Sequence, residues 1–158
     1  MKTAIVPGTF DPVTEGHLSV IKYAAARYDK VLVAVMNNPS KSPICDPQTR
    51  VKLIQKCTCG IENVSVIYRE GMLYELVKEN QPSDIVKGIR NDSDLLYEKA
   101  MADYNKRFSG ADTVYVLATD ELKNVSSSLV REYAKAGKAL GGFVPKQILE
   151  DVEQLYSK

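Results

Sequence analysis

The chain has 158 residues, a length that fits one domain, because two separate hydrophobic cores would each need on the order of 100 residues. Hydrophobic residues make up 44% and charged residues 26%, values that exclude disordered, collagen-like and disulfide-scaffold proteins. Lysine and arginine total 21 against 20 acidic residues, so the formal net charge of +1 provides no global field for nucleic acid or an anionic membrane. We therefore expect a single domain over residues 1–158, with any anion site formed locally.

The N-terminal segment MKTAIVPGTFDP predicts neither a signal peptide nor a membrane span. Pro7 and Asp11 interrupt its apolar run too early for either. We therefore expect a cytoplasmic protein that does not associate with membranes. The three cysteines and the single histidine lack the spacing of a zinc site, so free thiols are favoured and a thiolate metal site is the weaker alternative.

Short apolar segments alternate with amphipathic ones along the chain. The segments rich in β-branched residues predict strands at residues 2–6, 30–36, 64–68, 84–89 and 112–118. Apolar residues at helical spacing predict helices at residues 16–28, 47–57, 72–80 and 93–108, and the serines at 126–128 open a further helix. This alternation predicts an α/β fold, a doubly wound five-stranded parallel sheet with helices on both faces. Such sheets bind ligands beyond the carboxyl ends of their strands.

The loop after the first strand, PGTFDPVTEGH at residues 7–17, contains the only histidine of the chain. Gly8 would let the backbone come close to a ligand, and Thr9 can hydrogen-bond a phosphate oxygen. Gly16 and His17 lie where the free N–H groups and the dipole of a helix favour an anion. A tight strand-to-helix turn with an exposed histidine explains the same residues, so this loop alone leaves both interpretations open.

Cations and hydroxyl groups also follow the other strands, in the segments 37–43, 87–92 and 122–132. In the usual strand order, Lys41, Lys87 and Arg90 would converge near His17 and form a positive pocket in a nearly neutral protein. Each cation taken singly is more typical of a solvated surface. Of the serines at 126–128, one would cap the helix and the others would be free to hold phosphate, although a plain N-cap cluster is the alternative.

Taken together, these segments resemble a known family. GTFDPVTEGH resembles the T/HxGH signature of the nucleotidyltransferase superfamily. VSSSLVRE is similar to the second signature of that superfamily, in the form found in bacterial phosphopantetheine adenylyltransferases. NPSKSP, KGIRND with a following YE, and GGFVP occur in the family's order, so the resemblance runs the length of the chain. A match this extended is more specific than analogy of fold.

The resemblance implies that ATP and 4′-phosphopantetheine react to give dephospho-coenzyme A and pyrophosphate. It also implies Mg²⁺ held mainly by the ATP phosphates rather than by the protein, feedback binding of coenzyme A, and a homohexamer. The acceptor phosphate is already anionic near neutral pH, so in-line attack on the α-phosphorus needs positioning and charge stabilisation rather than a strong base. The loops contain no Ser–His or Cys–His pair for a covalent intermediate, which favours direct displacement.

The resemblance also assigns roles to individual residues. Thr9 and His17 would contact the transferred phosphate, and Lys41 would bridge the acceptor phosphate and the α-phosphate of ATP. Lys87 would hold the acceptor phosphate, while Leu73 would touch the pantetheine arm. The implied catalytic residues are His17, Lys41 and Arg90. The implied ATP-binding residues are Thr9, Phe10, His17, Gly88, Ile89, Arg90, Glu98, Leu122, Lys123, Asn124, Val125, Ser126, Ser127 and Ser128.

Two positions depart from the family pattern and leave alternatives open. Lys87 stands where the family usually has arginine, which exchanges a bidentate fork for a point charge. Residues 122–124, Leu-Lys-Asn, replace a segment that usually brings an aromatic residue, so the adenine contacts stay open. One alternative is a relative with another acceptor, such as a nicotinate-mononucleotide adenylyltransferase or a glycerol-phosphate cytidylyltransferase. Another is a nucleotide-binding module without turnover.

Overall fold

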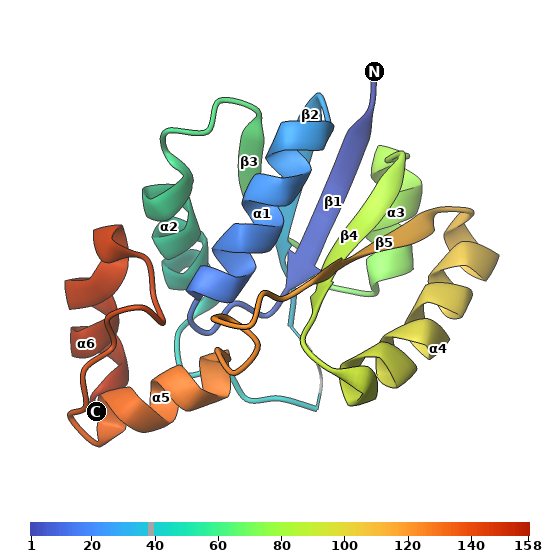
Figure 1. The fold of residues 1–158 in the computed structure, drawn as a ribbon. Coiled ribbons are helices and arrows are strands. Elements are labelled where there is room, and N and C mark those ends of the chain that lie inside the picture. The colour runs from blue at the N-terminus through green and yellow to red at the C-terminus, as the bar shows by residue number, and fades with distance from the viewer. Residues whose placement is uncertain (38–39) are drawn as a thin grey trace.

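The computed structural model describes residues 1–37 and 40–158, which form a parallel sheet covered by helices on both faces (Figure 1). The five strands of the described chain are β1 (Thr3–Gly8), β2 (Lys30–Val35), β3 (Val64–Tyr68), β4 (Asp84–Ile89) and β5 (Asp112–Leu117). The helices are α1 (Glu15–Arg27), α2 (Pro47–Thr58), α3 (Leu73–Asn80), α4 (Asp92–Ser109), α5 (Ser127–Lys135), the 3₁₀ turn η1 (Lys146–Ile148) and α6 (Leu149–Tyr156).

The strand order of the sheet is β3-β2-β1-β4-β5, and all neighbours are parallel. Winding runs outward from β1 in one direction through β2 and β3, and then in the other direction through β4 and β5. Helices α1 and α2 therefore pack on one face of the sheet, while α3 and α4 pack on the other (Figure 1). The expected doubly wound α/β sheet is confirmed.

The first strand is longer than predicted. It continues through Pro7 and Gly8, which lie opposite Ala34 and Val35 of β2. The amide of Met36 closes this edge by donating a 2.9 Å hydrogen bond to the carbonyl of Gly8. Pairing with a neighbouring strand thus overrides the turn preference of the Pro-Gly pair.

The C-terminal helix α6 was not among the predicted elements. Its buried side chains Val152 and Tyr156, with Ile148 of η1, recur every fourth residue and form one apolar stripe. They join the larger hydrophobic cluster, which lies on the α1 and α2 side of the sheet. A smaller cluster on the other face joins the sheet to α3 through residues such as Ile5, Leu76 and Ile85.

Strands β1 and β4 are paired only near their amino ends. In the part of the chain that the structure describes, they pair at two positions, Ala4 with Asp84 and Ile5 with Ile85. Beyond these positions β1 stays with β2, and β4 stays with β5. The pairing therefore ends at the point where the winding of the sheet reverses, which is where ligands of such sheets bind.

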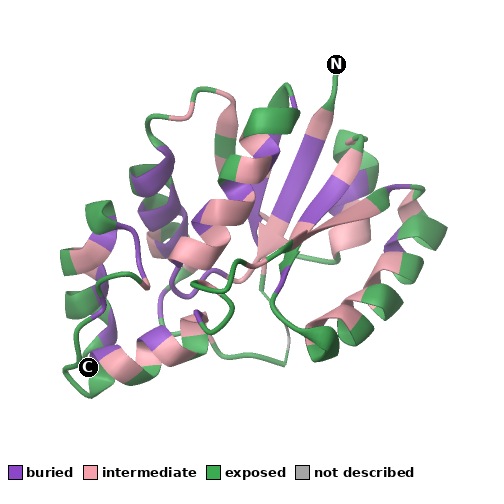
Figure 2. Cartoon of the chain, viewed as in Figure 1, coloured by how far each residue is buried: buried purple, intermediate pink, exposed green. Residues whose placement is uncertain are grey.

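Helix α4 is the longest helix, with 18 residues. Much of its surface is exposed or only half-buried (Figure 2). In the part of the chain that the structure describes, no helix combines the length and the apolar character needed to cross a membrane.

Candidate active site

His17 is held in place by the start of α1. Thr14 is the N-cap residue, and its hydroxyl accepts a 3.3 Å hydrogen bond from the amide of His17. In return, the amide of Thr14 donates to Nδ1 of His17 at 3.0 Å. This reciprocal capping box fixes the orientation of the imidazole. Because Nδ1 accepts a hydrogen bond, the neutral ring carries its proton on Nε2 and can donate it to an anion.

The surroundings of His17 keep its ring uncharged at neutral pH. Burial, and after it the positive charges of Arg90 and Lys41, lower the pKa of His17 from 6.5 to about 4. The ring of Phe10 packs edge-on against the imidazole, with 4.9 Å between ring centroids. His17 is thus a neutral hydrogen-bond donor placed among cations.

The side chain of Phe10 is packed inside the first loop. Phe10 is 2% exposed and has a φ of 52°, a left-handed conformation that is costly for a bulky residue. A Cβ on Gly8 would lie 2.9 Å from the Phe10 ring. Gly8 therefore makes room for that ring, and the close approach of a ligand to its backbone stays a prediction. A nucleotide could reach only the backbone of Phe10, not its side chain.

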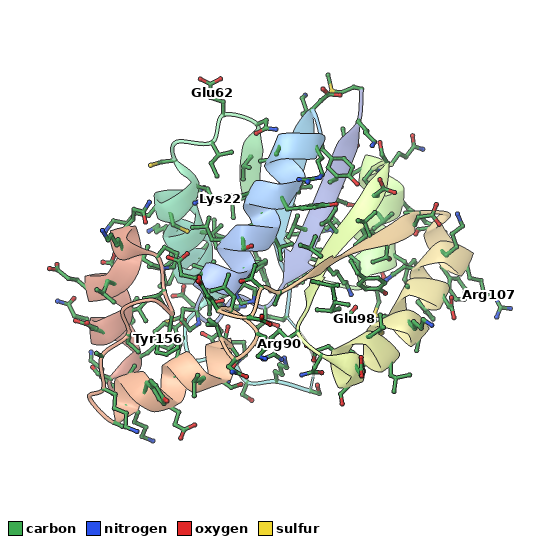
Figure 3. All side chains as sticks on the ribbon, viewed as in Figure 1. Lys22, Glu62, Arg90, Glu98, Arg107 and Tyr156 are labelled. Carbon is green, nitrogen blue, oxygen red and sulfur yellow. The ribbon has the colours of Figure 1, made fainter. Side chains whose placement is uncertain are left out.

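Two cations lie at the carboxyl edge near His17. Arg90 follows β4 at the base of the sheet (Figure 3), where its Nε donates to Asp94 at 3.1 Å. Lys41 is exposed in the segment that follows β2. Both positive charges lower the pKa of His17, which indicates that Arg90 and Lys41 lie near its ring. Residues 38–39 of the predicted 37–43 segment lie outside the described residues.

The side chain of Lys87 lies on the face of the sheet opposite to α1. A Cβ on its neighbour Gly88 would lie 2.7 Å from Val20 of α1, and side chains alternate along a strand, so Lys87 faces α4. There its Nζ lies 2.8 Å from Oε2 of Glu98, and both side chains are mostly buried (Glu98 is labelled in Figure 3). The predicted acceptor cation is therefore already ion-paired in this structure.

The loop before α5 docks onto the first loop. Ser126 caps α5 by accepting a hydrogen bond from the amide of Leu129 at 3.1 Å, and the hydroxyl of Ser127 donates to the carbonyl of Pro12 at 2.7 Å. Ser128 is exposed and accepts a 3.2 Å hydrogen bond from Nη2 of Arg131. All three hydroxyls thus have partners within the protein, and those of Ser126 and Ser127 act as a helix cap and as a link between loops.

The other predicted ATP and acceptor residues differ in exposure. Ile89 and Val125 are 5% and 4% exposed, so a nucleotide could contact only their backbone. Leu73 begins α3 and packs on the smaller hydrophobic cluster. At residues 122–124, Leu122 is half-buried while the next two side chains are exposed.

Sequence reasoning missed the residues that hold these loops together. Arg50 of α2 is 1% exposed. Its guanidinium donates to the carbonyls of Cys45 at 3.0 Å and Thr9 at 2.8 Å, and to Oδ1 of Asn37 at 2.8 Å. A signal was present, because Arg50 lies on the same helical stripe as the buried side chains Leu53, Ile54 and Cys57. A cation on an apolar stripe indicates a buried hydrogen-bonding role.

The three cysteines are free thiols. Cys45 and Cys57 are buried, and burial raises the pKa of Cys57 to about 11, so its thiol stays protonated. Among the described residues no three histidine, cysteine or acidic side chains gather closely enough to hold a metal ion.

Comparisons with known proteins bear on the family of this chain. A family model described as cytidylyltransferase-like matches residues 5–133. A phosphopantetheine adenylyltransferase from Caldanaerobacter subterraneus subsp. tengcongensis is 41% identical, over 100% of this chain and 99% of that protein. One from Clostridium novyi is 40% identical, over 96% of this chain and 95% of that protein. The chain belongs to the phosphopantetheine adenylyltransferase family. The resemblance drawn from its sequence is thereby confirmed.

A solved structure of a proposed nicotinate-nucleotide adenylyltransferase from Vibrio parahaemolyticus is also similar. It superposes with a TM-score of 0.66 over 96% of this chain and 99% of that chain. At 21% identity this likeness shows a shared fold and does not bear on the acceptor. Membership of the phosphopantetheine adenylyltransferase family therefore rests on the full-length relatives.

The lone histidine of this phosphopantetheine adenylyltransferase family member makes its titration easy to measure. We expect the Hε1 signal of His17 in proton NMR to titrate with a midpoint near 4 rather than 6.5, because burial and two cations disfavour the imidazolium. Stability should fall as the pH drops from about 6.5 toward 4, since the unfolded chain takes up a proton that the folded chain refuses. A midpoint near 6.5 would show that the ring is solvated.

Proposed function

We propose that this protein transfers the adenylyl group of ATP to 4′-phosphopantetheine, giving dephospho-coenzyme A and pyrophosphate. The observation that carries the proposal is the near full-length similarity, 37–41% identical, to curated relatives named phosphopantetheine adenylyltransferase. In the reaction an oxygen of the acceptor phosphate bonds to the α-phosphorus of ATP. The bond from that phosphorus to the bridging oxygen breaks, and pyrophosphate leaves with the electron pair.

The geometry around His17 supports direct displacement. The neutral imidazole donates through Nε2 without surrendering a proton, which suits a reaction whose nucleophile is already anionic. Arg90 and Lys41 supply positive charge where negative charge accumulates on the phosphates. The chain thus stabilises charge and positions the two substrates, and no group of the protein needs to form a covalent intermediate.

We propose that Mg²⁺ enters with ATP. Mg²⁺ keeps several waters and is commonly bound through substrate phosphates with one or two carboxylates. At the carboxyl edge, two positive side chains, Arg90 and Lys41, are available to bind the triphosphate. They suit a triphosphate whose negative charge is partly offset by Mg²⁺. We also propose a cytoplasmic location and feedback binding of coenzyme A, which contains the product's dephospho-coenzyme A moiety and would fit the same site.

The activity is tested by pyrophosphate release from ATP with a panel of acceptors. We expect turnover with 4′-phosphopantetheine and not with nicotinate mononucleotide or glycerol 3-phosphate. His17→Ala serves as the matched variant and should lower kcat about 100-fold or more, the usual cost of losing one transition-state donor. Its melting curve checks the fold. Turnover with another acceptor only would identify a different transferase, and ATP binding without turnover would identify a binding module.

We propose that Lys87 binds the acceptor phosphate. To do so, its ammonium group exchanges the Glu98 carboxylate for the phosphate. Lys87→Glu should raise the KM for 4′-phosphopantetheine by about two orders of magnitude, because it places two carboxylates beside a dianion, whereas the KM for ATP should change far less. Lys87→Arg keeps the charge and should be tolerated. Steady-state kinetics in both substrates at fixed salt measure this.

The matched control for charge reversal is Lys106→Glu. Lys106 also pairs with a carboxylate, Asp112 at 3.0 Å, but this exposed pair lies at the amino end of the sheet. The Lys106→Glu substitution should leave the KM for ATP and the KM for 4′-phosphopantetheine within about twofold of their original values. Lys87 has no role in acceptor binding if its charge reversal affects the acceptor KM no more than that of Lys106.

We propose that the chain assembles as a homo-oligomer, with the family's hexamer as the expected state. Support comes from large apolar side chains on α4 and the edge strand β5: Leu96, Tyr97 and Leu117 are 73%, 62% and 74% exposed. Apolar residues clustered at a sheet edge are typical of a surface that another chain covers.

Light scattering after gel filtration tests the assembly. We expect the unaltered protein to have the mass of six 17.5 kDa chains. Leu96→Glu should give a smaller assembly, because a neighbouring chain that covers this surface would bury the new carboxylate. Leu155→Glu on α6, at a residue that is 37% exposed, is the control. A monomeric unaltered protein would rule out the proposal.

A further inference from the structure

The last residue of α6, Tyr156, contacts the first loop (residues 7–17). Tyr156 is 1% exposed, and its hydroxyl donates a 2.7 Å hydrogen bond to Oδ1 of Asp11, which is 3% exposed. The two residues are 145 positions apart in the chain. Burial and the neighbouring carboxylate raise the pKa of Tyr156, so its hydroxyl remains a donor over the whole working pH range. Figure 3 labels Tyr156 at the end of α6, which packs beside α5.

The same carboxylate holds the segment that carries Lys41. Oδ2 of Asp11 accepts a 2.8 Å hydrogen bond from the amide of Ile44, and Oδ1 accepts a 3.2 Å hydrogen bond from the amide of Cys45. These amides begin three residues after Lys41. Asp11 therefore joins the first loop, the Lys41 segment and α6 at one buried point.

The other end of the Lys41 segment is held separately. Arg50 binds the side chain of Asn37 and the carbonyl of Thr9, which ties the start of the segment to the first loop. Lys41 itself is exposed between these two attachments. Its position relative to His17 therefore depends on both ends, and the downstream end depends on the orientation of the Asp11 carboxylate.

We propose that Tyr156 is a positioning residue for adenylyl transfer, because its hydroxyl fixes the Asp11 carboxylate and thereby the Lys41 segment. The inference rests on the proposed function, and it gives the C-terminal helix a part in the reaction. A displacement of a charged group by about 1 Å can lower a rate up to about 100-fold while leaving binding largely intact. The effect of losing the hydroxyl should therefore fall on kcat.

The test compares two tyrosine-to-phenylalanine variants. Tyr156→Phe keeps the ring and its packing, and should lower kcat about tenfold with both KM values within about twofold. Tyr28→Phe is the matched control, since the Tyr28 hydroxyl also donates to a carboxylate, Oδ2 of Asp84 at 2.7 Å, but at the amino end of the sheet. It should shift the melting temperature by a comparable amount and leave kcat unchanged. Equal kcat values for the two variants would overturn the proposal.

A double-mutant cycle shows whether Tyr156 acts through Lys41. Once Lys41→Ala has removed the charge, adding Tyr156→Phe should lower kcat little further, because the positioned group is gone. Independent, multiplying losses would overturn the proposal and leave Tyr156 with a structural role only.

Hydrogen exchange provides a readout that does not require turnover. The amides of Ile44 and Cys45 should exchange faster in Tyr156→Phe than in the unaltered protein, and should be unaffected in Tyr28→Phe. Unchanged exchange would overturn the link through Asp11. If the unaltered protein has no activity with 4′-phosphopantetheine, the proposed function fails, while the exchange rates still report on the link.

Discussion

The position of the site depends on the separation of β1 and β4 after their first paired residues. Because the winding reverses between these strands, the loop after β1 turns toward α1 and the loop after β4 turns toward α4. No crossover of the described chain runs between the two carboxyl ends, so a polar ligand can enter there without disturbing the core. The capped N-terminus of α1 and the end of β4 face this opening, which brings His17 and Arg90 together.

Irregular loops around such an opening need partners for their backbone groups. Arg50 and Asp11 supply many of these partners from buried positions, each by contacting more than one segment. A buried ionic group is costly unless its hydrogen-bonding capacity is filled, so these residues are stable only when the loops adopt this arrangement. The same hydrogen bonds that satisfy the buried groups therefore define the geometry of the site.

Charge is distributed unevenly in this nearly neutral protein. At the carboxyl edge, burial together with the charges of Arg90 and Lys41 keeps His17 neutral, whereas Lys87 on the other face of the sheet is offset by Glu98. A phosphate entering the Lys87 side must compete with a carboxylate that is already in contact. One near the imidazole meets the exposed Lys41, the Arg90 guanidinium with its Asp94 partner, and an N–H donor. The sheet thus separates two cationic regions of different strength, which suits two phosphate groups with different roles.

The sequence by itself determined the alternating strands and helices, the doubly wound sheet, the edge where the site lies, and the family to which the chain belongs. These follow from local periodicity and from motifs of consecutive residues. Only the tertiary structure decided that Phe10 fills the space over Gly8, that Lys87 contacts Glu98, and that Tyr156 donates to Asp11. Each of these contacts joins groups whose positions relative to each other depend on how the elements pack. A periodic pattern specifies which face of an element is buried, but not which polar atom of a distant segment will satisfy it.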